Sequence, residues 1–312
     1  MNNLTFDDVV AAQKRLKDYV KNTPVLSDEK LNKELGAQVF FKMENQQESN
    51  SFKARGAFNA VLAYKEKHGK FPQKIVVQSS GNHAQAIANV CKKFGIKALI
   101  YMINKASSVK IAAARNLGAE VVLLEKRSEV NRLAEEKQKE GYFFIHPSAN
   151  AEVICGQGTS ALEALSEIGE VDAIFMPCGG GGLAAGTYLA AQDLSPKAKV
   201  FACEPLNAND VAISVRDGKI FSFADTPNTI ADGTRTLATS EICFNYLKRF
   251  DGILEIPEDE INPWREKLEK TFAQKIEPTS ALAIAGAQQF LKNNPQLKNL
   301  KLLVIISGGN VA

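Results

Sequence analysis

The stretch SNSFKARG, residues 49–56, places a single lysine, Lys53, among small residues at the start of a predicted helix. The backbone can hold a lysine at such a loop-to-helix junction and strip it of water. This favours a neutral amine that forms a Schiff base with an aldehyde cofactor. The alternative is a solvated lysine in the first turn of a helix, which is the commoner use of this residue. The rest of the chain has to decide between these two interpretations.

On either side of this stretch, short apolar segments alternate with longer helical ones. The pattern predicts helices over 5–19, from about 52, and over 84–94, 109–117 and 129–139. It predicts strands over 39–43, 74–78, 98–102, 120–124, 142–145, 173–176, 200–203, 253–255 and 302–306. Parallel strands covered by helices on both faces have such short, continuously apolar sequences. The predicted fold class is therefore α/β, with open, mainly parallel twisted sheets flanked by helices.

The length of 312 residues is enough for about two domains with well-buried cores. Polar residues interrupt the alternation near 44–49 and near 146–150, where the chain would cross between domains. We therefore predict a discontinuous arrangement, in which residues 1–46 and 147–312 form a large domain and residues 47–146 a small one.

Composition and charge narrow the class of protein. The net charge is only +3 and the lysines are evenly spread, so the sequence indicates neither a basic nucleic-acid-binding surface nor a polybasic membrane-binding patch. The longest apolar runs, such as 302–306, have the length of a strand and cannot span a bilayer. The five cysteines are too far apart for a CxxC or zinc pattern, and no secretory signal precedes them. We expect a cytoplasmic protein with reduced cysteines and with neither nucleic acid nor membrane as a partner.

Residues 79–83, SSGNH, lie between the predicted strand 74–78 and the helix that follows it. A helix N-terminus offers free backbone N–H groups and the positive end of its dipole, which suits a substrate carboxylate. The alternative is a capped turn with a satisfied histidine. The candidate binding residues here are Ser79, Ser80, Asn82 and His83.

Residues 178–186, CGGGGLAAG, follow the predicted strand 173–176. Four consecutive glycines, Gly179, Gly180, Gly181 and Gly182, let the backbone approach an anion and point several N–H groups at it. No GK[ST] follows, and no dinucleotide spacing is present, so a single cofactor phosphate fits better than a nucleotide.

Two further junctions carry polar residues. Residues 307–310, SGGN, follow the last predicted strand, and the Ser307 hydroxyl can exchange one hydrogen bond with a ring nitrogen, although an ordinary turn is the alternative. Glu204 and Asp210 flank a short loop whose carboxylates and carbonyls suit a hard cation. An acidic surface loop is the alternative there.

The sequences of these junctions and of the stretch around Lys53 resemble those of the serine racemase and serine/threonine dehydratase (threonine ammonia-lyase) family of pyridoxal-phosphate enzymes. The segments occur in the same order, and the resemblance covers essentially the whole chain. The resemblance implies the two-domain fold type II of these enzymes, which is tryptophan synthase β-like. The matching segments are SFKARGA, SSGNHAQA, ICGQGT, CGGGGLAAG, EPLNAND, IADGTRT, EPTSAL and SGGN.

The resemblance implies roles for the matched residues. Lys53 would hold pyridoxal 5'-phosphate and act as the base on one face of the substrate α-carbon, and Ser80 would protonate the opposite face. Cofactor contacts would come from Phe52, Asn82 at the phenolic oxygen, Gly179 to Gly182 at the phosphate and Ser307 at the pyridine nitrogen. Substrate contacts would come from Ser79, Ser80, Asn82, His83 and Gly233. Glu204, Asp210 and the Ala208 carbonyl would bind Mg²⁺, Mn²⁺ or Ca²⁺.

Three positions depart from the family pattern, and the role of a fourth, Arg235, is open. Asn50 replaces a usual glycine, and its side chain can narrow the carboxylate end of the pocket although asparagine tolerates left-handed backbone angles. Thr236 replaces serine and Ser148 replaces asparagine. Arg235 is either a surface residue or the partner of a second substrate carboxylate. The identity of the substrate therefore stays open.

The implied function is β-elimination of L-serine or L-threonine to a 2-oxo acid and ammonia, with serine racemisation as an accompanying activity. A serine at the pyridine nitrogen, unlike a carboxylate, cannot stabilise a fully protonated ring, which favours prompt elimination over transamination. The alternative enzyme is an L-threo-3-hydroxyaspartate dehydratase, and the alternative from another class is a non-catalytic amino-acid-binding protein. The resemblance also implies a homodimer.

Overall fold

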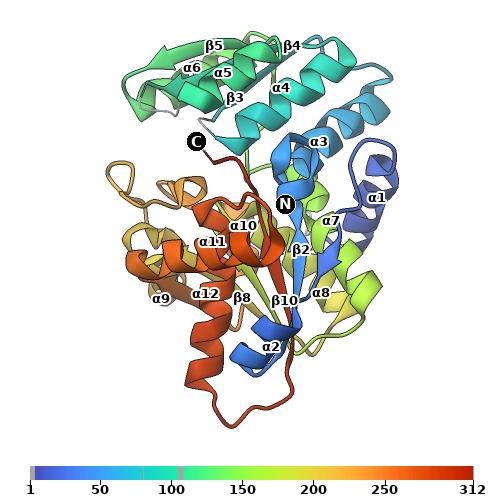
Figure 1. The fold of residues 1–312 in the computed structure, drawn as a ribbon. Helices are drawn as coiled ribbons and strands as arrows, with labels where there is room; N and C mark the ends of the chain where they lie inside the picture. The colour runs from blue at the N-terminus through green and yellow to red at the C-terminus, as the bar shows by residue number, and fades with distance from the viewer. Residues whose placement is uncertain (1–3, 80, 105–107, 312) are drawn as a thin grey trace.

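The computed structural model describes residues 4–79, 81–104 and 108–311. Two sheets flanked by helices make up these residues, with the smaller sheet above the larger one in Figure 1. All strand pairs but one are parallel. The predicted α/β class with mainly parallel sheets is therefore confirmed.

Within the described residues, the small sheet has four strands in the order β5, β4, β3, β6. Their bounds are Glu120–Leu124, Lys97–Ile103, Lys74–Gln78 and Phe143–Phe144. The helices that connect them are α4 (Asn82–Phe94), α5 (Ser108–Asn116) and α6 (Arg127–Lys139). Each strand predicted in this region is present, although β6 is two residues shorter than the predicted 142–145.

The large sheet has six strands among the described residues, in the order β1, β2, β10, β7, β8, β9. Their bounds are Val25–Leu26, Gln38–Met43, Lys301–Ile306, Ala173–Pro177, Lys199–Pro205 and Gly252–Ile256. β1 pairs antiparallel with β2 and was absent from the predicted strands, because two residues are too short to show a period.

Both faces of the large sheet are buried, and alternate strand residues enter different cores. Ile174 and Met176 pack into one core with α1 (Phe6–Leu16), α7 (Ala151–Ile168), α8 (Gly182–Leu194), α9 (Asp210–Asp217) and α10 (Glu241–Leu247). Ala173 and Phe175 pack into the other with α2 (Glu29–Leu35), α11 (Glu258–Phe272) and α12 (Pro278–Asn293). This burial explains why the strands are apolar throughout rather than alternating.

The parallel register brings distant loops to one edge of the large sheet. β2 and β10 pair from Gln38 and Lys301 up to Met43 and Ile306, so both strands end at the same level. Beyond that level, Ser51 bridges to Gly308, and the Phe52 amide donates to the Ser307 carbonyl over 3.0 Å. Ligands bind at this carboxyl edge in open α/β sheets.

The helix α3 (Lys53–His68) leaves this edge and packs against α7. The two helices approach at glycines, because a Cβ on Gly156 would lie 2.6 Å from the Arg55 carbonyl oxygen. The strands of the small sheet all fall within residues 47–146, and those of the large sheet fall outside them. The proposed domain boundaries themselves stay a prediction.

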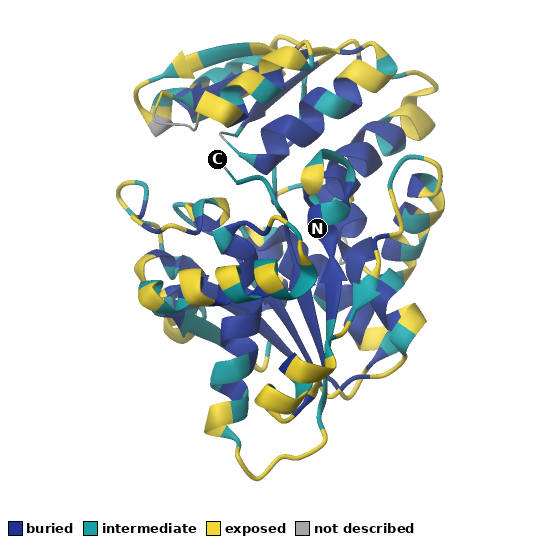
Figure 2. Cartoon of the chain, in the orientation of Figure 1, coloured by how far each residue is buried: buried dark blue, intermediate teal, exposed yellow. Residues whose placement is uncertain are grey.

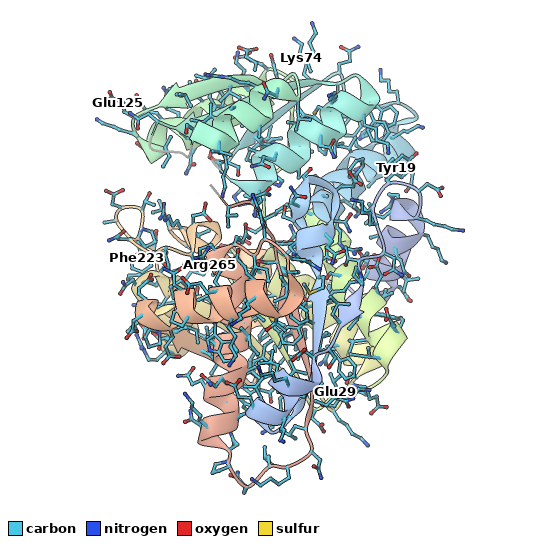
Figure 3. The ribbon with its side chains drawn as sticks, viewed as in Figure 1. Tyr19, Glu29, Lys74, Glu125, Phe223 and Arg265 are labelled. Carbon is cyan, nitrogen blue, oxygen red and sulfur yellow. The ribbon has the colours of Figure 1, made fainter. Side chains whose placement is uncertain are left out.

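Exposed residues lie on the outer helices and loops, whereas the central strands β2, β10, β7 and β8 of the large sheet are largely buried (Figure 2). The exposed Lys74 lies on the side of the small sheet that faces away from the large sheet, and the exposed Glu125 lies at one end of the small sheet (Figure 3). All five cysteines lie within the described residues and are buried with free thiols. None of the described helices combines the length and apolar character needed to cross a membrane.

Candidate active site

Lys53 is the first residue of α3 and lies at the carboxyl edge of the large sheet. Its Nζ donates to the Pro147 carbonyl over 3.2 Å and lies 4.8 Å from the centre of the Phe52 ring. Burial lowers the pKa of Lys53 from 10.5 to about 8, although Cys243, Glu277 and Cys178 act in the opposite direction. The amine is therefore neutral in a larger fraction of molecules than a solvated lysine, as a Schiff-base lysine requires.

The loop before Lys53 contains two residues in the left-handed backbone region, Ser49 with φ 59° and Asn50 with φ 51°. Asparagine tolerates this region, as expected from the sequence at Asn50. The Asn50 amide faces the Asn310 side chain at 3.4 Å and borders a cavity of about 420 Å³. The other residues lining that cavity are Asn45, Gln46, Gln274, Lys275 and Gly309.

The glycine loop connects β7 to α8. Among the described residues, the backbone N–H groups of Gly179, Gly180, Gly181 and Gly182 have no acceptor. A Cβ on Gly180 would approach the Ser148 Oγ to 2.5 Å, so a larger residue would not fit at this position. Free N–H groups at a helix N-terminus are suited to binding a phosphate group.

Two residues beside this loop received no role from the sequence. Ser148 directs its hydroxyl at Gly180, and Gln157 would contact a Cβ on Gly182 at 2.6 Å through Oε1. The Gln157 Oε1 is buried without a partner among the described residues, whereas its Nε2 approaches the Pro147 carbonyl at 3.5 Å. The ICGQGT segment was the available signal for Gln157, but nothing in it indicates the direction of the side chain.

Ser307 and Asn82 meet at a buried carboxyl that the sequence alone did not single out. Glu277 is 1% exposed and accepts from the Asn82 Nδ2 at 2.8 and 3.1 Å and from the Ser307 Oγ at 3.4 Å. Burial raises the pKa of Glu277 from 4.5 to about 7, and the Asn82 hydrogen bond opposes this shift. Residues 82, 277 and 307 are far apart in the chain, so only the fold brings them together.

The predicted substrate turn is described in part, because Ser80 lies outside the described residues. Ser79 accepts from the Gly81 amide at 3.3 Å, and the His83 Nε2 lies 3.0 Å from the Ile145 carbonyl. Burial lowers the pKa of His83 to about 3, so this imidazole is neutral at physiological pH. An Nε2–H that donates to Ile145 leaves Nδ1 as an acceptor, and Nδ1 has no partner among the described residues.

Gly233 lies next to the glycine loop, since a Cβ on Gly179 would approach the Gly233 carbonyl oxygen to 3.0 Å. Its own amide donates to the Thr279 Oγ1 over 3.0 Å. Arg235 lies nearby but is exposed, and its guanidinium donates to the Thr229 carbonyl over 2.6 and 2.9 Å. This contact agrees with the interpretation of Arg235 as a surface residue.

Glu204 and Asp210 are both buried, which does not fit the alternative of an acidic surface loop. The Glu204 carboxylate accepts from the backbone amides of Val211 and Ala212 at 3.3 and 2.9 Å. Burial and the neighbouring Asp210 raise the pKa of Glu204 well above its usual value, and burial raises that of Asp210 to about 7.

The donor set for a cation is nevertheless small. The Asp210 Oδ2 is buried without a partner among the described residues, and Ala208 is fully buried in the turn η3 (Leu206–Ala208). The described part of the chain contains no group of three or more His, Cys, Asp or Glu residues that could hold a metal ion. Two carboxylates with backbone carbonyls still fit a hard cation that retains several waters.

Comparison with known proteins identifies a family model and relatives that match almost the whole chain. The family model described as "Pyridoxal-phosphate dependent enzyme" matches residues 16–308. The chain is 42% identical to the L-threo-3-hydroxyaspartate ammonia-lyase of Saccharomyces cerevisiae, over 98% of this chain and 93% of that protein. It is 39% identical to the serine racemase of Schizosaccharomyces pombe, over 98% and 94%.

A solved structure has the same fold. The threonine deaminase from T.th. superposes with a TM-score of 0.91 at 36% sequence identity, covering 99% of each chain. The three related proteins carry different activities in their names. Similarity alone therefore fixes the family and the fold but leaves the substrate open.

Proposed function

Because this chain belongs to the family of pyridoxal-phosphate dependent enzymes, we propose that it eliminates water and ammonia from L-serine or L-threonine to give a 2-oxo acid. We include racemisation of serine in the proposal. The observation that carries it is Lys53, whose pKa is lowered to about 8 at the sheet edge that also presents the glycine loop, Asn82 and Ser307. Relatives with racemase and dehydratase names support this choice.

The described residues fit the cofactor. The free N–H groups of Gly179 to Gly182 would hold its phosphate, and the Ser148 hydroxyl adjoins the same space. Asn82 and Ser307 would bind its ring oxygen and ring nitrogen, with Phe52 beside them. Pyridoxal phosphate, once bound, withdraws electrons from the substrate α-carbon and thereby acidifies its proton.

The chain's own residues then move protons. Once the substrate amine has displaced it from the cofactor, Lys53 would accept the α-proton at Nζ, and the β-hydroxyl would leave with a proton as water. The resulting enamine hydrolyses in solvent to the 2-oxo acid and ammonia. For racemisation, Ser80 would supply a proton to the opposite face of the α-carbon, a role that rests on the sequence alone. The turn formed by Ser79, Ser80, Asn82 and His83 would hold the substrate carboxylate.

The test is incubation of the purified, cofactor-loaded protein with L-serine while pyruvate and D-serine are followed together. Both products support the proposal in full. Pyruvate alone would restrict the protein to dehydration. If neither forms from L-serine and no 2-oxo acid forms from L-threonine, the proposed function is wrong.

L-threo-3-hydroxyaspartate is the second candidate substrate, because the Saccharomyces cerevisiae relative named for it is 42% identical. Its second carboxylate needs a cation, and the predicted one, Arg235, is exposed and held by a backbone carbonyl. We therefore rank this activity second. Activity on both substrates should be measured for the wild type and for the Arg235→Ala protein. A selective loss of activity on the dicarboxylate would assign Arg235 to substrate binding.

A non-catalytic amino-acid-binding protein is the alternative from another class. Membership of an enzyme family and the lowered pKa of Lys53 argue against it. A purified protein without a visible absorbance that borohydride abolishes would support it.

We propose that Glu204, Asp210 and the Ala208 carbonyl bind Mg²⁺, or Mn²⁺ or Ca²⁺ in its place. The unpartnered Asp210 Oδ2 supports this proposal, since a cation offsets the repulsion of two buried carboxylates. At 100 times its dissociation constant, Mg²⁺ should stabilise the fold by about 2.7 kcal/mol, and a chelator should remove that gain. Thermal unfolding measures it.

Asp210→Asn should abolish this stabilisation, whereas Asp217→Asn should retain it, because Asp217 is exposed at the other end of α9. Equal melting temperatures with Mg²⁺ and with chelator would show that these two carboxyls bind no cation.

The lowered pKa of Lys53 predicts how fast the apoprotein captures pyridoxal phosphate. Only the neutral amine attacks the aldehyde, so the rate should rise about tenfold per pH unit below 8 and level off above it. Stopped-flow absorbance from pH 6 to pH 10 tests this, with free lysine as the control. A rate that rises as steeply to pH 10 would mean that Lys53 is an ordinary lysine.

A cytoplasmic location, expected from the cysteine pattern, and a homodimeric assembly, implied by the resemblance, also belong to the proposal. Size-exclusion chromatography with light scattering tests the dimer. The small net charge of +3 supports the expectation that nucleic acid is not a partner.

A further inference from the structure

Glu277 is a buried carboxyl without a paired cation. It forms the N-cap of α12, is 1% exposed and makes no ion pair with a described residue. Its amide donates to the Gly308 carbonyl over 3.0 Å, and a Cβ on Gly308 would approach its Oε1 to 2.6 Å. Burying a carboxyl is unfavourable unless hydrogen bonds compensate for lost water, so its partners explain its presence.

The first partner is Asn82, on the small-sheet side of the site. The Asn82 Nδ2 donates to both Glu277 oxygens, and its Oδ1 accepts from the Asn310 Nδ2 at 3.0 Å. When Glu277 is ionised, its carboxylate only accepts hydrogen bonds, so the amide nitrogen then faces Glu277. Both ends of the amide are therefore fixed. The nitrogen can direct its second N–H at an acceptor such as the cofactor's ring oxygen.

The second partner is Ser307, on the large sheet. The Ser307 Oγ lies 3.4 Å from the Glu277 Oε1 and 3.1 Å from the Ser280 Oγ. Ser280 in turn donates to the Gly308 carbonyl and accepts from the Gly308 amide, both at 2.9 Å. A hydroxyl carries a single proton, so the Glu277 carboxylate competes with any ring nitrogen for the proton of Ser307. Glu277 therefore influences whether the Ser307 hydroxyl donates to the carboxylate or to a ring nitrogen.

We propose that Glu277 is a positioning residue that orients Asn82 and Ser307 together, and thereby sets the hydrogen bonds at both polar ends of the cofactor ring. The proposal rests on the proposed function, since it takes pyridoxal phosphate as the ligand. It adds a carboxyl group to the environment expected at the ring nitrogen, because the Glu277 Oε1 lies 3.4 Å from the Ser307 hydroxyl.

Glu277→Gln is the informative variant, since glutamine keeps the size but replaces one acceptor oxygen with a donor. Donor would then face donor at Asn82, which donates to both Glu277 oxygens, and the Ser307 hydroxyl would lose an acceptor if the new amide faced it. In fluorescence titrations of the apoproteins with pyridoxal phosphate, the dissociation constant should rise at least about tenfold, as expected for loss of a hydrogen bond to a charged group. The absorbance maximum of the bound cofactor should shift as well.

Glu269→Gln is the matched control. The Glu269 carboxylate accepts from the Ile276 amide at 3.1 Å, next to Glu277 in the chain, but makes no contact with Asn82 or Ser307. The Glu269→Gln protein should bind pyridoxal phosphate with the wild-type dissociation constant and the wild-type absorbance spectrum. An equal effect of both variants would mean that Glu277 merely supports the fold, and would overturn the proposal.

A double-mutant cycle separates positioning from direct binding. The cycle starts from a protein that carries both Asn82→Ala and Ser307→Ala. If Glu277 acts through these two partners, adding Glu277→Gln should raise the dissociation constant of pyridoxal phosphate by less than about twofold. A further loss of about tenfold would overturn the proposal. Should Glu277→Gln fail to fold, Glu277→Asp replaces it, because the shorter carboxylate keeps its charge but withdraws from Asn82.

Failure of this inference differs from failure of the proposed function. A wild-type protein that binds no pyridoxal phosphate would overturn both. If the wild type binds pyridoxal phosphate and the Glu277→Gln protein has the same dissociation constant and absorbance spectrum, only the proposed role of Glu277 is overturned.

Discussion

Replacing Lys53 with alanine should abolish turnover, with a loss of at least about 10³-fold to 10⁴-fold, because one amine would serve as both the covalent anchor and the base. Lys53 begins α3, and its buried Nζ donates to the Pro147 carbonyl over 3.2 Å. The measurement is release of 2-oxo acid from L-serine and L-threonine by the purified variant.

Lys67→Ala is the matched control, since Lys67 is exposed in the last turn of the same helix. It should leave turnover unchanged. Borohydride reduction followed by peptide mass analysis should place the cofactor on the peptide containing Lys53 in the wild type and in the control. Continued release of 2-oxo acid by the Lys53→Ala protein would contradict the assignment.

Replacing Arg55 with methionine should have the largest effect on stability, about 3–5 kcal/mol of unfolding free energy. The Arg55 guanidinium is fully buried and donates to Glu44 at 2.8 Å through two nitrogens and to Glu163 at 2.6 and 2.7 Å. Lys42, also fully buried, donates to Glu163 at 2.7 Å. The cluster is neutral, with two cations and two carboxylates, so removing one cation leaves a buried negative charge.

The carboxylates hold the pKa of Arg55 above its ordinary value, and Arg55 helps to keep that of Glu44 low. Arg55→Lys should not restore full stability, because an ammonium cannot make the forked contacts with both glutamates. Urea unfolding measures the loss. Arg132→Met, which breaks an exposed pair with Glu136 on α6, should lose less than about 1 kcal/mol. An Arg55→Met protein as stable as this control would refute the role of the cluster.

The Arg55 cluster also bears on the site, because Arg55 lies two residues after Lys53 in the first turn of α3. Its partner Glu44 follows β2 and Glu163 lies on α7, so the cluster ties the Lys53 helix to two elements of the large-sheet unit. This anchoring supports the fixed position of the amine.

Much of the fold was predictable because the strands of a doubly covered sheet are apolar throughout. The segments 74–78 and 120–124 are predicted with the bounds of β3 and β5, and the other predicted strands agree within a few residues. β1 was missed, since a two-residue antiparallel strand has neither a length nor a period signal. The polar residues after β3, β7, β8 and β10 were recognised from their place at strand ends.

The partners of these residues were not predictable in the same way. Glu277 begins the matching segment EPTSAL, but nothing in that segment gave it a role, and its contact with Asn82 spans 195 positions. Arg55 reads as one more basic residue in a helix, although it is fully buried. Such contacts depend on side-chain direction and on which loops share a sheet edge, and neither is encoded locally.

The sequence by itself determined the fold class and singled out the lysine and the glycine loop as candidates, because glycine runs, strand lengths and short motifs are local properties. Only the tertiary structure decided that Glu277 joins Asn82 to Ser307, that Arg55 is neutralised by Glu44 and Glu163, and that Arg235 faces outward. The physical reason is burial. The charge state and orientation of a polar group are set by the neighbours that replace its water, and those neighbours come from distant parts of the chain.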